Sequence, residues 1–429
     1  MTRRRRILLA TALLGCALAF LHILAPQRVH LLTLPPGPRT PSISLGQFHG
    51  LVLAPDGSLW CWGGEERGWP VLGQGKTSFS PDLIRIGLET NWVRISAGSD
   101  HNLALKSDGT VWSWGGNYKG QLGPGLDPTG MATNRIVPLE KTPVRRLAGN
   151  DWVQIIAGYA ASFGLKRDGT LWAWGLNNFG QLGIGSLISS ILPVQVGNAT
   201  NWIKICEGGV SAAGIQSDGS LWIWGGSPQL GNRAPGSTQN LLVPTRFGSN
   251  TNWADVSVAF NLWLGIKSDG SLWAWGRIAH QFTGDAPDNF DTPTRIGRDS
   301  DWASVYSSDG GFYHLLRRRD GSFWILDLTG RTSGSMRLTR LDLPDDIVAF
   351  EARGRAAAFI TSGGAIWTCG QVLGQPSGRD RAMRLLDGAW VRFGLRPRWS
   401  SDPNPVNRPQ PWQLRLSDRT RPQQNPPNP

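Results

Sequence analysis

Histidine side chains are the first candidates for chemistry in this chain, and their spacing favours structural roles. Of the six histidines, His49 and His101 each lie seven residues before an aspartate, Asp56 and Asp108, so they occupy one position of a repeated pattern. We expect each to make a hydrogen bond within the fold. No histidine pair has metal-site spacing, and the sequence holds no nucleophile elbow, phosphate loop or metalloprotease motif. The sequence therefore predicts no catalytic residue, no cofactor and no metal.

Acidic and basic residues also recur at fixed places. The aspartates that directly precede a glycine are Asp56, Asp108, Asp168, Asp218, Asp269 and Asp320. An acidic ring is one interpretation, but Asp-Gly is also a common turn pair, which explains all six without catalysis. The run Arg317-Arg318-Arg319 is interpreted as a solvated strand edge, with contact to an acidic partner as the alternative.

Three cysteines follow the N-terminal region, and none has metal-like spacing. Cys61, Cys206 and Cys369 are expected to be small buried hydrophobic residues. A disulfide between Cys61 and Cys369 is the alternative, because they fall in the first and last copies of the repeat.

A turn glycine followed three residues later by tryptophan recurs seven times. Successive turn glycines are 43 to 60 residues apart. Asp-Gly between two alternating apolar runs predicts a two-residue hairpin in which both turn residues have positive φ. The pairs are Gly57 and Trp60, Gly109 and Trp112, Gly169 and Trp172, Gly219 and Trp222, Gly270 and Trp273, Gly321 and Trp324, and Gly364 and Trp367.

Further tryptophans keep the same register. Five copies have a second tryptophan two residues after the first, and residues two apart share one face of a strand. Another tryptophan precedes the second to sixth copies, and one follows the last copy: Trp92, Trp152, Trp202, Trp253, Trp302 and Trp390. We favour packing over stacking on a ligand as the role of these side chains. Each unit thus supplies a hairpin, a glycine-rich loop and a strand around Asn-Trp, with a fourth strand in the loop region. Units of this length with β signals indicate propeller blades.

The full pattern runs His-x-Leu-Ala-Leu, Asp-Gly, Trp-x-Trp-Gly and Gly-Gln-Leu-Gly, and it is closest in residues 97–123 and 157–183. It resembles the RCC1 (regulator of chromosome condensation) repeat over about residues 43–395. The resemblance implies an all-β, seven-bladed β-propeller, in agreement with the seven units counted from the residues. The last two copies depart from it, because Leu326 and Cys369 stand where the second tryptophan is expected.

The C-terminal end of the array suggests how the ring closes. The segment around Trp390 matches residues 91–95, which precede the second copy, whereas the first copy has no such segment. We therefore expect the strand around Trp390 to complete the first blade. Its loss should expose an apolar edge.

The ends of the chain differ from the array. Residues 1–6 are basic, 7–25 are apolar, 26–41 form a proline-rich linker, 42–395 form the propeller, and 396–429 form a disordered Pro/Arg-rich tail. The apolar run is long enough to span a bilayer, and the preceding arginines favour a cytoplasmic N-terminus. An uncleaved signal anchor, a signal peptide cleaved at Ala17-Leu18-Ala19 and a lipoprotein modified at Cys16 remain open. All three place the propeller outside the cytoplasmic membrane.

The charge distribution bears on the partner. The net charge is +12, but residues 1–39 and 394–429 together hold twelve arginines and only two acidic residues, so the body is nearly neutral. This disfavours nucleic acid, whose binders carry basic residues on the folded surface. We expect a monomeric, non-enzymatic protein-binding scaffold, held to the membrane by its N-terminal helix.

The loops at 123–150 and 186–192 are the candidate contacts of that scaffold. The resemblance supports such a scaffold, because bacterial relatives of the family include secreted inhibitory propellers that cap an enzyme. It also implies an alternative, nucleotide exchange on a small GTPase, as in the eukaryotic namesake. An extracytoplasmic carbohydrate-active enzyme is a further alternative.

Overall fold

The computed structural model describes residues 33–64, 70–75, 79–125, 139–226, 240–259, 262–277, 289–307, 313–327, 337–341, 343–353, 356–370 and 391–392. The N-terminal segments at 1–6 and 7–25, Trp390 and the tail at 396–429 lie outside these residues, so the membrane helix stays a prediction. Within the described ranges, no helix has the length and apolar character needed to cross a bilayer.

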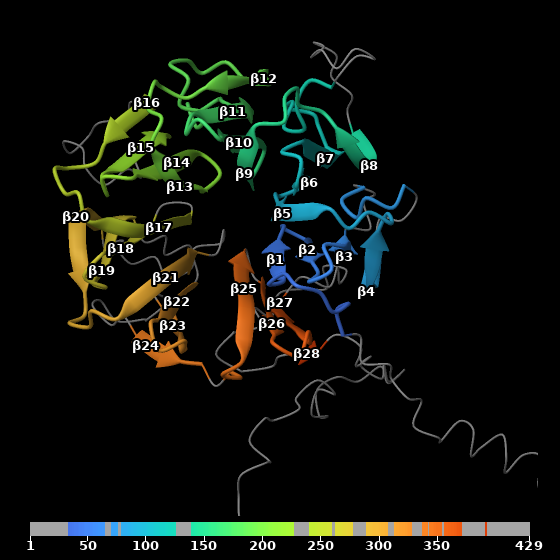
Figure 1. Cartoon of the computed structure of the whole chain (residues 1–429). Coiled ribbons are helices and arrows are strands. Elements are labelled where there is room, and N and C mark those ends of the chain that lie inside the picture. The colour runs from blue at the N-terminus through green and yellow to red at the C-terminus, as the bar shows by residue number, and fades with distance from the viewer. Residues whose placement is uncertain are drawn as a thin grey trace, which may run out of the picture.

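Seven four-stranded antiparallel sheets form a ring, which confirms the all-β seven-bladed propeller (Figure 1). The blades are β1–β4 (Ser42–Leu45, His49–Leu53, Leu59–Gly64, Phe79–Ile86), β5–β8 (Trp92–Ala97, His101–Lys106, Val111–Gly116, Leu139–Arg145), β9–β12 (Trp152–Ala157, Ala161–Lys166, Leu171–Gly175, Ser190–Gln195), β13–β16 (Trp202–Glu207, Ser211–Gln216, Leu221–Gly225, Leu241–Arg246), β17–β20 (Trp253–Ala259, Leu262–Lys267, Leu272–Arg277, Asn289–Ile296), β21–β24 (Trp302–Ser307, Tyr313–Arg318, Phe323–Asp327, Arg337–Arg340) and β25–β28 (Ile347–Arg353, Ala356–Thr361, Ile366–Gly370, Val391–Arg392).

Within each blade the strands are paired in chain order from the centre of the ring outward (Figure 1). The Asn-Trp strand of the repeat is the innermost strand of the blade that follows, and the fourth strand expected in the loop region is the outermost. Because the innermost strands of neighbouring blades contact one another, they enclose a central channel.

The hairpin between the second and third strands is closed by three residues rather than by the expected two. In the second blade the Lys106 N–H donates to the Thr110 carbonyl over 3.0 Å, and the Gly109 N–H donates to the Lys106 carbonyl over 3.0 Å. This is the pattern of a type I turn followed by a left-handed residue, so only the glycine needs positive φ. All seven turn glycines have it, with φ between 74° and 87°.

Apolar side chains pack between adjacent blades, and the second tryptophan of the repeat also makes polar contact there. The Trp114, Trp174 and Trp224 side chains are fully buried. Their indole Nε1 atoms donate to loop carbonyls of the preceding blade, at 2.9 Å to Val71, 2.9 Å to Gln121 and 2.8 Å to Gln181. These tryptophans thus join blades by hydrogen bonds as well as by packing.

Ring closure differs from the prediction. The C-terminal strand β28 pairs with β27, opposite Trp367 and Thr368, so it is the outer strand of the seventh blade. The first blade has an innermost strand of its own, β1. The expectation that the segment around Trp390 completes the first blade was wrong, because the described residues of that segment, Val391 and Arg392, pair with β27 of the seventh blade.

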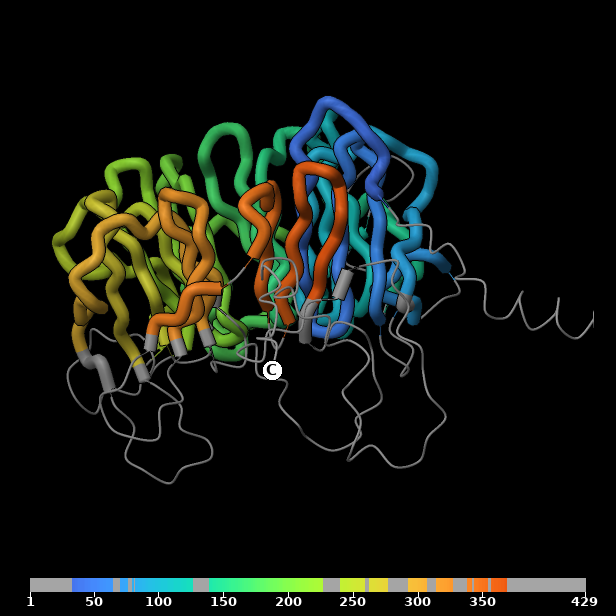
Figure 2. Tube along the Cα trace, turned by 90° about the horizontal axis from the view of Figure 1, so that it is seen from below, coloured from blue at the N-terminus to red at the C-terminus, as the bar shows by residue number. Residues whose placement is uncertain are grey.

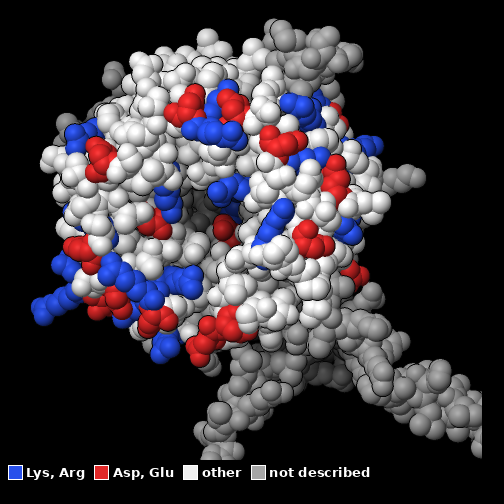
Figure 3. Space-filling view, viewed as in Figure 1, with Lys and Arg blue, Asp and Glu red and all other residues white. Residues whose placement is uncertain are grey.

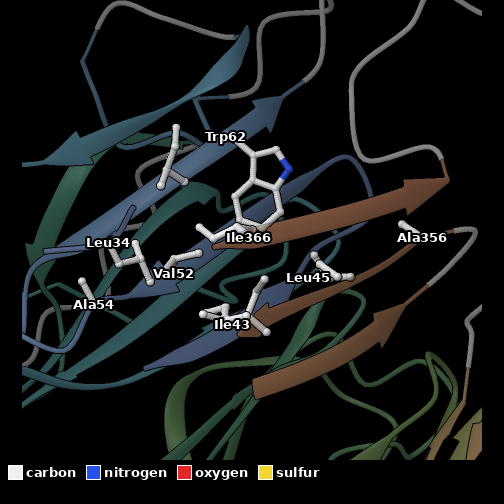
Figure 4. Packing of buried hydrophobic residues seen from close by; sticks show 11 residues of the cluster. Leu34, Ile43, Leu45, Val52, Ala54, Trp62, Ala356 and Ile366 are labelled. Carbon is white, nitrogen blue, oxygen red and sulfur yellow. The ribbon is translucent and has the colours of Figure 1, made fainter. Parts of the chain in front are cut away.

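The first and seventh blades are joined by residues 33–34, within the segment assigned to the linker. Thr33 forms an isolated bridge with Ala365, and the Leu34 N–H donates to the Gly364 carbonyl over 3.2 Å. The Leu34 side chain is buried with residues of both blades, including Ile43 and Ile366 (Figure 4). We call residues 33–34 the latch.

Leu34 occupies the place that tryptophan holds in other blades. The backbone N–H groups of Trp253 and Trp302 donate to the turn glycines of the blades before them, Gly219 at 3.0 Å and Gly270 at 3.1 Å. Leu34 makes the same bond to the turn glycine of the seventh blade. An aliphatic residue therefore replaces the repeat tryptophan at the point where the ring closes.

Candidate functional site

The strand order gives the ring two distinct faces (Figure 2). The turn face carries the hairpin turns between second and third strands and the links between blades. The loop face carries the connections from first to second and from third to fourth strands. Each repeat position therefore recurs on one face, and each face can be assessed for chemistry by itself.

The turn aspartates are engaged in local hydrogen bonds. Asp108 Oδ1 accepts from the backbone N–H of Thr110 at 2.9 Å and from its hydroxyl at 2.7 Å. Trp112 Nε1 donates to the same hydroxyl at 3.1 Å. The bonds from Thr110 hold the pKa of Asp108 below its ordinary value. The same Asp–hydroxyl–Trp relay occurs at Asp56, Asp168, Asp218, Asp269 and Asp320.

Cationic side chains cover the tryptophans on this face. Lys106 Nζ lies 3.7 Å from the ring centroid of Trp112 and 4.8 Å from that of Trp92. Lys166, Lys267 and Arg318 lie over tryptophan pairs of their own blades in the same way. The first tryptophan of each repeat is half-buried, and in these four blades the cation over its ring stabilises the blade.

The arginine run of the sixth blade is divided among different contacts. Arg318 pairs with Asp299 at 2.6 Å and with Asp301 at 3.2 Å. The Arg319 guanidinium donates to the Ser268 carbonyl at 3.1 Å, and Arg317 lies over the Phe323 ring. The run therefore forms intramolecular bonds on different sides of the strand.

Polar groups of the innermost strands bridge neighbouring blades around the channel. Lys204 forms an ion pair with the buried Asp255, and the other Asp255 oxygen accepts from the Val305 N–H at 3.1 Å. Arg353 donates across the ring to the carbonyls of Ala97 and Ala157. Figure 3 shows charges of both signs interleaved around the central hollow. The polar groups named here are occupied in holding the ring together.

One buried set resembles a Ser–His–Asp triad in its residue types. His101 Nε2 lies 2.9 Å from Ser162 Oγ, and its Nδ1 lies 3.7 Å from Asp100 Oδ1. The Ser162 hydroxyl donates to the Gln121 carbonyl at 2.8 Å, so His101 must donate to Ser162 rather than accept its proton. Both side chains are inaccessible to solvent. The arrangement therefore lacks the geometry of a nucleophile and its base.

The first-blade histidine makes an equivalent bond between blades. His49 Nε2 donates to Asn102 Oδ1 at 2.6 Å, and Asn102 in turn donates to the Val71 carbonyl at 2.9 Å. His314 is buried in the sixth blade, at the strand position that Asn102 holds in the second. Burial lowers the pKa of His49 and of His314 to about 4 and also lowers that of His101. All three are neutral at pH 7, and His280 lies outside the described residues.

The cysteines are unreactive where the structure describes them. Cys61 is a free thiol whose Sγ donates to the Leu72 carbonyl at 3.0 Å, so the alternative disulfide with Cys369 is wrong. Burial raises the pKa of the Cys61 thiol and raises that of Cys206 to about 12. Both stay protonated at neutral pH. Among the described residues, no cluster of histidine, cysteine and carboxylate could hold a metal ion.

The loop face carries exposed aromatic side chains over the third and fourth blades. Tyr159 is 55% exposed and Phe179 is 45% exposed. A Cβ built on Gly226 would lie 3.4 Å from the Cβ atoms of Phe179 and Val210, and one built on Gly209 would lie 3.9 Å from the Tyr159 Cβ. The two aromatic residues therefore flank a floor of Gly209, Val210 and Gly226, and we call these five residues the aromatic patch.

Polar contacts fix the backbone beneath the patch. The Glu207 carboxylate accepts from the Tyr159 N–H at 3.1 Å and from the Gly209 N–H at 2.9 Å, so it ties the two blades together. The Phe179 N–H donates to Gln181 Oε1 at 3.0 Å. The patch is therefore held in place before any partner binds, which reduces the entropic cost of binding.

The second candidate loop is also ordered and apolar. Buried Asn177 donates from Nδ2 to the carbonyls of Ser186 at 2.8 Å and Ile188 at 3.1 Å. Ile188 is 77% exposed, and Leu187 is exposed beside it. In the first candidate loop, residues 126–138 lie outside the described residues and 139–145 form β8. Tyr159 and Phe179 were not among the residues predicted for the site, although a lone aromatic residue beside glycine in a loop is a usable signal.

Known proteins share this sequence pattern over part of the chain. The chain is 34% identical over 160 residues to human HERC6, a probable E3 ubiquitin-protein ligase. It is 28% identical over 157 residues to the ultraviolet-B receptor UVR8 of Arabidopsis thaliana. The matches cover 36% and 37% of this chain but only 15% and 34% of those proteins.

Solved structures agree in fold over most of the chain. Human WBSCR16 superposes with a TM-score of 0.59 at 18% identity, covering 73% of this chain and 85% of its own. Yeast RCC1 (Prp20), crystallised with Kap60, gives a TM-score of 0.60 at 18% identity, with 83% and 85% covered. The sequence model of the RCC1-like domain family matches residues 22–316, more than half of this chain. The chain therefore belongs to the RCC1-like domain family.

Proposed function

We propose that the chain is a non-enzymatic scaffold that binds a partner protein through its loop face. The observation that carries the proposal is the aromatic patch, in which two exposed aromatic side chains flank small residues of the next blade. Tyrosine and other aromatic residues are enriched in the energetic centres of protein interfaces. Leu187 and Ile188 extend the apolar surface on the third blade.

Two further observations support a binding role. The groups that could suggest catalysis, His101 with Ser162 and Lys204 with Asp255, are engaged in bonds between blades. Yeast RCC1, which shares the fold, holds Kap60 in its crystal structure. A propeller of this kind offers a preformed surface to a protein partner with little rearrangement.

Loss of the aromatic patch should reduce partner capture. We expect Tyr159→Ala with Phe179→Ala to weaken retention of a partner by about tenfold or more, because such anchors carry much of the binding energy. The measurement is quantitative mass spectrometry after affinity purification of the full-length protein from cells that produce it.

Leu88→Ala is the matched control, because Leu88 is 86% exposed but follows β4 on the turn face. It should retain the partner. Equal loss from both variants, or no loss from the double variant, would overturn the assignment to the loop face.

We also propose that the propeller is displayed outside the cytoplasmic membrane. The support is the basic run at residues 3–6 followed by the apolar segment 7–25. An alkaline-phosphatase fusion after Pro429 should be active, and a fluorescent protein that matures only in the cytosol should be dark at the same position. The reverse pair of results would contradict export.

A further inference from the structure

The outermost strands of the first five blades each contain a proline, which hinders the addition of a further strand. In the second to fifth blades, a proline lies two residues before the residue paired with the first tryptophan of the repeat. Proline has no N–H, so the outer edge lacks a donor at that point. These residues are Pro143, Pro193, Pro244 and Pro293, and β4 of the first blade has Pro81 two residues further back.

The outermost strand of the sixth blade lacks this proline. In β24 Arg340 pairs with Trp324, so Leu338 holds the proline position. The Leu341 N–H donates to the Phe323 carbonyl at 2.8 Å, and bonded pairs alternate along an antiparallel ladder. The N–H and carbonyl groups of Leu338 and Arg340 therefore point away from β23. No strand of the described chain pairs with that edge, which lies on the rim of the ring (Figure 1).

The ladder of the sixth blade is also more regular than the others. The third and fourth strands of the first five blades change register near a glycine, such as Gly175 or Gly225. The pairing of β23 with β24 continues from Trp324–Arg340 to Asp327–Arg337 without a shift. Bulges twist an edge away from further pairing, so a regular edge is the better template for an added strand.

The edge itself carries one exposed cation, Arg340, in surroundings of mixed charge that include Asp320 and the exposed Asp345 and Asp346. Arg298 is exposed on the link from the fifth blade. Figure 3 shows lysine and arginine interleaved with aspartate and glutamate over the part of the ring formed by β17–β24, at the lower left. Asp299 and Asp301 in this region are paired with Arg318. A carboxylate placed across from Arg340 would therefore gain a favourable cross-strand pair.

We propose that the outer edge of β24 binds an extended segment of a partner protein as a fifth strand of the sixth blade, with an acidic side chain beside Arg340. Main-chain hydrogen bonds to Leu338 and Arg340 would supply affinity, and the arginine would supply selectivity. The inference rests on the proposed function as a scaffold, but it concerns the rim of the ring and not the aromatic patch.

The test uses a synthetic probe, an acetylated and amidated heptapeptide that alternates valine with threonine and glutamate, added to the full-length protein. We expect binding with a Kd below about 1 mM and slower hydrogen exchange at the amides of Leu338 and Arg340. Leu338→Pro should abolish both effects, and it should fold because four blades carry proline at this position. Leu338→Ala keeps the N–H and should bind within about twofold of the unchanged protein.

Charge reversal separates strand addition from nonspecific adhesion. Arg340→Glu should weaken the acidic probe by about tenfold or more and favour a probe with lysine in place of glutamate. No binding of the acidic probe at about 1 mM, equal binding by Leu338→Pro, or concentration-dependent dimerisation through β24 in sedimentation would overturn the proposal. If Tyr159→Ala with Phe179→Ala still releases the captured partner, the scaffold function stands and only the rim inference fails.

Discussion

Deleting residues 1–34 should loosen the first and seventh blades together, whereas deleting residues 1–32 should leave both as stable as in the full chain. Leu34 is 6% exposed and packs against both blades, and its N–H is bonded to Gly364. Its loss removes the backbone bridge between these blades and part of the apolar packing that joins them, and leaves only the contacts of β1 with β25 and β26. We expect amide hydrogen exchange to become faster in both Leu51–Trp62 and Ala356–Gly370 in the same deletion variant.

A point variant makes the same test without shortening the chain. Leu34→Ala should lower the free energy of unfolding by about 2–5 kcal/mol, the usual cost of truncating a buried leucine. Truncation after Arg392 retains β28 and should have little effect. If Leu34→Ala melted like the unchanged protein, or if only the seventh blade lost protection, the latch would not be what closes the ring.

Acidification from pH 7 to pH 4 should destabilise the ring steeply, because its buried histidines are neutral. Burial lowers the folded-state pKa of His49 and His314 to about 4, whereas the unfolded value is about 6.5. Above pH 6.5 both states are neutral and the stability is complete. Between pH 6.5 and 4 the unfolded chain takes up protons that the folded ring does not, so stability falls, and below pH 4 this loss levels off. Over this pH range each histidine can lower the free energy of unfolding by on the order of 3 kcal/mol.

The measurement is denaturant unfolding at pH 7, 5.5 and 4.5 for the unchanged protein and for His49→Gln with His314→Gln. The glutamine amide can still donate to Asn102, but it does not titrate, so the double variant should show a much shallower pH dependence. Parallel curves for the two proteins would mean that other groups govern acid unfolding. The turn aspartates have lowered pKa values, so their contribution is lost only as the pH falls through those values, below about 4.

The blade count and the strands of each blade were readable from the sequence because the same residues recur in register. The turn glycines are one example: a backbone with φ near 80° accepts glycine far better than other residues, so the requirement appears in each copy. The loop length was misjudged because Asp-Gly suits both two-residue and three-residue hairpins, and the distinguishing bond from Lys106 to Thr110 is between backbone groups.

Ring closure and the candidate binding surface were less accessible. Leu34 bonds to Gly364 through its backbone, and no tryptophan identifies this position in the sequence. The segment around Trp390 has the tryptophan of the repeat, but its described residues 391–392 pair with β27. The aromatic patch joins Tyr159 to Gly209 and Gly226 of the next blade, and such proximity depends on how blades pack. The neutral state of His49 likewise follows from burial between blades, which no local pattern reports.

The latch has a consequence for biosynthesis. Leu34 is among the first propeller residues to leave the ribosome, and its partner Gly364 is 330 residues later in the chain. Blades can form successively as they are made, since their sheets are local, but the interface of the first blade must stay uncovered until the last hairpin emerges. During that interval Leu34, Ile43 and Leu45 are exposed to other nascent chains. The demand for chaperone protection should therefore be greatest near the end of translation, and a stop codon before the seventh blade should yield a chain that aggregates although six blades can form.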